Sequence, residues 1–100
     1  MKTIENRQTE MPFKEKDEEQ IRQATYFDLV RYCLNQTPQG GFTFEEMRRR
    51  LRILEAISSA PESAALEDAD LDKLKECVTA ARWLSLDKTV VEFSDYIRNL

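Results

Sequence analysis

The chain has 100 residues, a length that fits one domain with a single modest core. Charged residues make up 34% of it and the net charge is −4, which disfavours general affinity for nucleic-acid phosphates or anionic membranes. Only two glycines and three prolines interrupt the chain, and this composition favours helices over a sheet-rich fold.

Residues 1–14 are mostly polar, with Pro12 as a break, and they predict a flexible N-terminal arm, or a tail that a partner orders. They lack the apolar run of a secretory signal, and nowhere do about 18 apolar residues follow one another. We therefore expect a cytoplasmic protein that does not enter a membrane. Residues 15–100 are expected to form one helical domain.

A first helix is predicted over residues 15–36, with acidic residues 17–19 in its opening turns, where the helix dipole favours negative charge. Its apolar side chains, Tyr26 and Leu29 among them, cover most of the circumference from residue 24 onward. Such a helix is either central in its own bundle or partly covered by another copy of the protein. The sequence leaves both alternatives open.

The segment 37–41, Thr-Pro-Gln-Gly-Gly, is predicted to be a turn because proline ends a helix and glycine permits positive φ. A phosphate-binding loop is disfavoured, since no Lys-Ser or Lys-Thr pair follows and the next helix opens with Glu45 and Glu46. The short connection predicts that the first two helices form an antiparallel hairpin.

The clearest helix runs from Phe42 to Ile57, with Thr43 as N-cap and a glutamate three residues later to complete a capping box. Its apolar residues form two neighbouring stripes, so we expect it to pack against two neighbours. The first stripe contains Phe44, Met47, Leu51 and Leu54, and the second contains Ile53 and Ile57. The second stripe either packs under a later helix or joins Tyr26 or Leu29 in an exposed strip that pairs two copies.

Four arginines lie together in this helix: Arg48, Arg49, Arg50 and Arg52. A basic run after a turn is a feature of DNA-recognition helices. However, Glu45 and Glu46 lie four residues before two of the arginines and can neutralise them as i,i+4 pairs. A solvated paired face, a protein-binding face and a nucleic-acid surface are the three interpretations, in decreasing order of preference.

A connection over residues 58–70 precedes a third helix, residues 71–84, which Asp68 or Asp70 caps; a fourth helix follows over residues 87–99. Trp83 projects away from the apolar stripe of the third helix. It is interpreted either as a cover for the corner between the third and fourth helices or as an interface anchor, because tryptophan is frequent at binding hot spots.

The sequence contains few candidate residues for catalysis or for metal binding. The chain has no histidine, which excludes Ser-His-Asp and Cys-His catalytic systems and every His-ligated zinc site. The acidic clusters lie at predicted helix starts, where capping and solvation explain them better than acid–base catalysis or a cation site. Cys33 and Cys77 are expected to be reduced core thiols. No catalytic, cofactor-binding or metal site is predicted.

The sequence thus predicts an all-α protein, a small four-helix bundle built from two antiparallel helical hairpins with a flexible N-terminal arm. We expect a non-enzymatic protein–protein interaction module, self-associating as a possible homodimer, that serves in assembly, as an adaptor or as an inhibitor. In general character such a chain is similar to accessory proteins of bacteria and their phages. The expected interface residues are Tyr26, Leu29, Arg48, Arg50, Arg52, Ile53, Ile57 and Trp83. The alternative is a small helix-turn-helix-like transcriptional regulator that binds DNA through the Arg48 to Arg52 helix.

Overall fold

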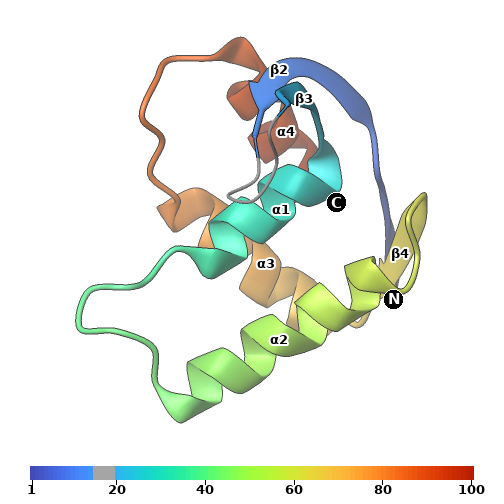
Figure 1. Cartoon of the computed structure of the whole chain (residues 1–100). Helices are drawn as coiled ribbons and strands as arrows, with labels where there is room; N and C mark the ends of the chain where they lie inside the picture. The colour runs from blue at the N-terminus through green and yellow to red at the C-terminus, as the bar shows by residue number, and fades with distance from the viewer. Residues whose placement is uncertain (15–19) are drawn as a thin grey trace.

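The computed structural model describes residues 1–14 and 20–100, which form four helices and two small antiparallel sheets (Figure 1). In chain order the elements are β1 (Lys2–Glu5), β2 (Gln8–Phe13), β3 (Arg22–Thr25), α1 (Tyr26–Asn35), α2 (Phe44–Ser58), β4 (Ser63–Leu66), α3 (Asp68–Ala80) and α4 (Lys88–Arg98). The predicted all-α four-helix bundle is therefore wrong, and the protein has an α/β fold.

The N-terminal residues form strands, so the prediction of a flexible arm is also wrong. β1 pairs with β4 in an antiparallel register from Lys2 opposite Leu66 to Glu5 opposite Ser63, while β2 pairs with β3. β1 buries a single large side chain, Ile4, and exposes its neighbours. A four-residue strand with one inward side chain has a polar composition, which is why its sequence resembles that of a disordered segment.

The first predicted helix is shorter than expected, because α1 begins at Tyr26 and residues 22–25 pair with β2 as a strand. Thr25 and Asp28 form a capping box at its start, and the Thr25 hydroxyl accepts a hydrogen bond from the Asp28 N–H. The acidic residues 17–19 that were predicted in the opening turns lie outside the described residues.

The other three predicted helices are confirmed, with ends that shift by a few residues. α2 has Thr43 as its N-cap, whose hydroxyl accepts from the Glu46 N–H at 3.1 Å. α3 begins at Asp68, before the predicted start, and α4 begins after Asp87, whose carboxylate accepts from the Thr89 N–H at 2.8 Å. The connection predicted over residues 58–70 contains β4.

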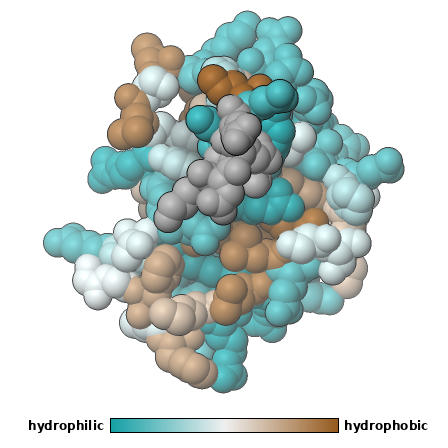
Figure 2. Space-filling view, viewed as in Figure 1, coloured by the Kyte–Doolittle hydropathy of each residue, from teal (hydrophilic) through white to brown (hydrophobic). Residues whose placement is uncertain are grey.

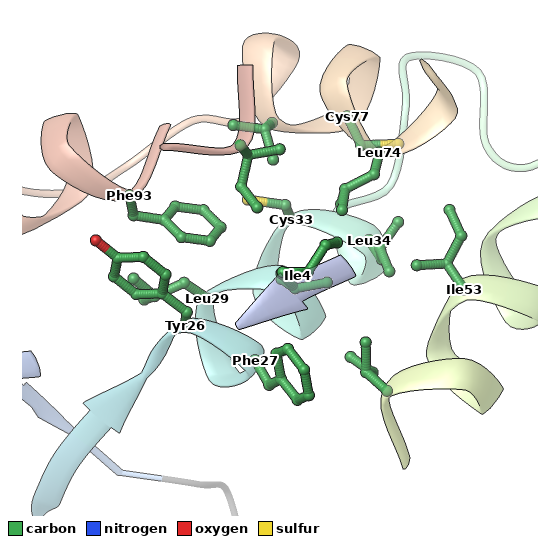
Figure 3. Packing of buried hydrophobic residues seen from close by; sticks show 14 of the residues in the cluster. Ile4, Tyr26, Phe27, Leu29, Cys33, Leu34, Ile53, Leu74, Cys77 and Phe93 are labelled. Carbon is green, nitrogen blue, oxygen red and sulfur yellow. The ribbon is translucent and has the colours of Figure 1, made fainter. Parts of the chain in front are cut away.

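The hydrophobic core surrounds α1, which contacts α2 and α3, and it includes side chains from every helix (Figure 3). Ile4 of β1 points into this cluster, to which Phe27 and Leu34 of α1 also belong. Phe93 of α4 closes one side and packs edge-on against Tyr26, with the ring centroids 5.3 Å apart. The crowded circumference of the first predicted helix is therefore explained by its central place in a single chain.

Candidate protein-interaction surface

α2 has one buried side and one exposed apolar side. Ile53 and Ile57 on the inner side are fully buried, whereas Phe44, Met47 and Leu51 on the outer side are 74%, 48% and 55% exposed. We call these three outer residues the α2 strip. Both stripes of this helix were expected to pack against neighbours. The second one does, beneath α1, α3 and β4, and Leu54 of the first stripe also packs against the core. The other three residues of the first stripe, which form the α2 strip, face solvent.

Shallow grooves border the α2 strip on both sides. One, with a volume of about 480 Å³, is lined by Phe44, Met47, Arg48, Leu51, Arg52 and Glu55. The other, of about 200 Å³, is lined by Leu34, Asn35, Phe42, Met47, Arg50, Leu51 and Leu54. Met47 and Leu51 line both, so they form a ridge between two hollows. Figure 2 shows apolar residues gathered in the lower part of the molecule, where Figure 1 places α2.

A partly buried ionic group holds the inner side of α2 in place. The Arg50 Nε donates to a Glu46 carboxylate oxygen at 3.0 Å, and its Nη1 donates to the carbonyl oxygens of Leu34 and Gln36 at 2.9 and 3.0 Å. The buried Lys73 of α3 donates to the other Glu46 oxygen. Arg50 therefore ties the last carbonyls of α1 to α2, and Lys73 ties α2 to α3.

The charges around Glu46 also set its ionisation. The hydrogen bond from Lys73, followed by that from Arg50, holds the pKa of the Glu46 carboxyl below its usual range. The predicted i,i+4 pair between Glu46 and Arg50 is thereby confirmed, and the arginine of that pair is a structural residue whose side chain is 12% exposed.

The arginine run divides into residues with different environments. The Arg48 guanidinium lies 4.8 Å from the centre of the Phe44 ring, beside the α2 strip. Arg52 is exposed and its Nε lies 3.3 Å from a carboxylate oxygen of Asp70 on α3. Since Arg50 turns inward and Arg52 is paired with a carboxylate, the run does not present one continuous basic patch.

Four of the predicted interface residues lie in the core. These are Tyr26, Leu29, Ile53 and Ile57, and all four are buried within one chain. Of the two alternatives for Ile53 and Ile57, the structure shows packing beneath neighbouring elements. The exposed apolar residues of α2 are instead those of the α2 strip, which the sequence assigned to packing.

Trp83 is half-buried after the end of α3 and packs on α1. Its ring centroid lies 4.6 Å from that of Tyr32, at an angle of 32° between the planes, and the Tyr32 hydroxyl donates to the Arg82 carbonyl oxygen at 2.8 Å. This tryptophan thus holds the segment after α3 against α1, so it has a structural contact whether or not it also meets a partner.

Replacing Trp83 with alanine is expected to lower the free energy of unfolding by about 2 kcal/mol, less than for a fully buried aromatic residue. Chemical denaturation followed by circular dichroism measures this change. Leu84→Ala is the matched control, because the neighbouring leucine is fully exposed and its truncation should leave stability unchanged. Equal stability of wild type and Trp83→Ala would contradict the structural role of the stacked pair.

The two cysteines are buried free thiols in the core. Burial raises the pKa of the Cys33 thiol to about 12, and burial likewise raises that of Cys77. Both thiols therefore stay protonated near neutral pH, where a thiol is a poor nucleophile. Among residues 1–14 and 20–100, no three His, Cys, Asp or Glu side chains gather as a metal site.

A second apolar feature lies on the connection between α3 and α4, where Leu84 and Leu86 are fully exposed. The third helix was predicted to reach residue 84, but α3 ends at Ala80 and α4 begins at Lys88, so both leucines lie between the two helices. None of the described helices is both long and apolar enough to cross a membrane.

No family model, no curated protein and no solved structure matches this chain.

Proposed function

We propose that the protein is a non-enzymatic protein-binding module whose contact surface is the α2 strip. The observation that carries this proposal is the exposure of Phe44, Met47 and Leu51 along one side of a helix. Their spacing of three and four residues is the pattern by which one helix face anchors in a partner. Large contiguous apolar surfaces on small proteins mark binding sites, because exposing them to water is unfavourable.

The rigidity of α2 supports the same proposal. The helix is fixed from behind by Ile53 and Ile57 in the core and by the contacts of Arg50 to the end of α1. A surface that is already ordered loses little conformational entropy on binding, so more of the contact energy appears as affinity. The grooves on either side of Met47 and Leu51 can receive side chains of a partner.

Assembly, adaptor and inhibitor roles all follow from such a surface. A DNA-binding role draws less support, because it needs cations that are free to meet phosphates, whereas Arg50 and Arg52 contact groups of their own chain. The proposal places the module in the cytoplasm, where cysteines such as Cys33 and Cys77 remain reduced.

A matched pair of surface variants tests the proposed function. Leu51→Glu places a charge in the α2 strip, and Val91→Glu places the same charge on α4 at a position with nearly equal exposure, 55% against 56%. Neither residue is part of the core, so both variants should melt within a few degrees of the wild type. Tagged wild type and both variants are then used to capture binding proteins from cells of the native host.

We expect to capture a protein that binds both wild type and Val91→Glu. Its affinity for Leu51→Glu should be lower by a factor of at least about 10. A second, differently tagged copy of the chain counts as such a protein. If Leu51→Glu binds everything that wild type binds, the α2 strip is not the contact surface and the proposal fails. Binding of nucleic acid that survives moderate salt would instead favour the DNA-binding alternative.

A further inference from the structure

We infer that the α2 strip binds the α2 strip of a second copy, with the two helices antiparallel and a two-fold axis at Leu51. This inference rests on the proposed function, since it names the partner of the same surface. It follows from the arrangement of side chains before and after Leu51. A two-fold contact requires a surface that is complementary to itself when reversed.

The size of the side chains along α2 meets this requirement. Phe44 lies seven residues before Leu51 and Ser58 lies seven residues after it, so all three fall on one seam of the helix at the spacing of a coiled coil. Phe44 and Ser58 are both exposed. In an antiparallel pair centred on Leu51, the large Phe44 ring of each copy meets the small Ser58 of the other, and the two leucines meet at the axis.

The charges beside the seam are also complementary to themselves when the second helix is reversed. Arg48 and Glu55 are both exposed and line the same groove of α2, three residues before and four residues after Leu51. Reversing the second helix places Arg48 of each copy beside Glu55 of the other, which gives two ion pairs. In a parallel pair the two-fold axis runs along the helices and puts equivalent residues on opposite sides of the seam, so Arg48 would not meet Glu55 of the other copy. The sign pattern therefore selects the antiparallel orientation.

Three further charged residues of α2 do not oppose this contact. Arg52 is held by Asp70 of α3, and Arg50 and Glu46 point into their own chain. The 15 residues of α2 span about 22 Å, and one helix face of that length buries less than the roughly 800 Å² per partner of a stable complex. We therefore expect a weak dimer with a Kd on the order of 100 µM.

Charge reversal on the full chain tests the inference. Light scattering and sedimentation should show the wild type changing from the monomer mass of 11.8 kDa to twice that value as its concentration is raised through the expected Kd. Arg48→Glu and Glu55→Arg should each remain monomeric, because each brings like charges together at both pairs. An equal mixture of the two variants should form a heterodimer, and the chain with both substitutions should dimerise like the wild type. Circular dichroism checks that each variant is folded.

Results that differ from these expectations overturn the inference. A wild type that stays monomeric at ten times the expected Kd has no such dimer, and a dimer that ignores both charge reversals uses another surface. A mixture of the two variants that stays monomeric excludes the antiparallel pairing. The proposed function is tested separately by Leu51→Glu: if a different protein is captured through the α2 strip while the chain remains a monomer, the proposed function stands and this inference fails.

Discussion

The substitution Ile4→Ala is expected to lower the free energy of unfolding by about 2 to 5 kcal/mol, the usual cost of truncating a fully buried isoleucine. Domains of this size have a total stability of roughly 5 to 15 kcal/mol, so the loss is a large fraction of it. The reason is that Ile4 lies in the middle of the core (Figure 3), although it comes from a strand near the N-terminus. Urea denaturation measures the effect.

Thr3→Ala provides the matched control for this substitution. Thr3 lies next to Ile4 in β1, opposite Ala65, but its side chain is exposed, so its truncation should change stability by less than about 0.5 kcal/mol. If Ile4→Ala and Thr3→Ala were equally stable, the first residues of the chain would behave as the flexible arm that their composition suggested, and the pairing of β1 with β4 would be contradicted.

The substitution Asp28→Asn should have the second large effect on stability. The buried Asp28 carboxylate accepts hydrogen bonds from Arg22 at 2.6 and 2.9 Å and from the Thr25 N–H at 2.8 Å, and so joins β3 to the start of α1. Replacing the buried carboxylate by a neutral amide weakens these charge-assisted hydrogen bonds and is expected to cost about 2 kcal/mol at neutral pH. Asp95→Asn, which changes an exposed carboxylate on α4, should cost almost nothing.

The pH dependence of stability provides a second readout of Asp28. Burial alone would raise the pKa of this carboxyl, but hydrogen bonds from Arg22 and Thr25 outweigh that effect and hold the pKa below its ordinary value of 3.8. A carboxyl whose pKa is lower in the folded than in the unfolded protein stabilises the fold above the unfolded-state pKa. This contribution is lost as the pH falls toward the folded-state pKa. Wild type should therefore lose stability below about pH 5 more steeply than Asp28→Asn. Parallel pH curves for the two proteins would contradict this role.

Periodicity predicted the long helices because their signals are local and repeated. The Thr43 cap and the apolar spacing of α2 were sufficient to place that helix, and the apolar stripes of α3 and α4 placed those two helices in the same way. The strands were not predicted, for the opposite reason. β1 and β4 are four residues each and lie about 60 residues apart in the chain, so neither contains enough alternation to indicate a strand without its partner.

The candidate surface was predicted less well than the helix that carries it. Two apolar stripes on α2 were apparent from the sequence, but which one faces solvent depends on where α1, α3 and β4 pack. Charged residues of both signs flank each stripe, so charge pattern alone does not distinguish them. Arg48 and Glu55 lie beside Leu51, whereas Glu46 and Arg50, beside Ile53, have their charges satisfied inside the protein.

The most direct test of the central claim follows the methyl groups of the protein by NMR as a binding partner, or further copies of the chain, are added. If the α2 strip is the contact surface, the methyl signals of Met47 and Leu51 shift, while those of Leu84, Leu86 and Val91, which are at least as accessible, stay in place. Shifts at Leu84, Leu86 or Val91 with unchanged Met47 and Leu51 signals would contradict the claim.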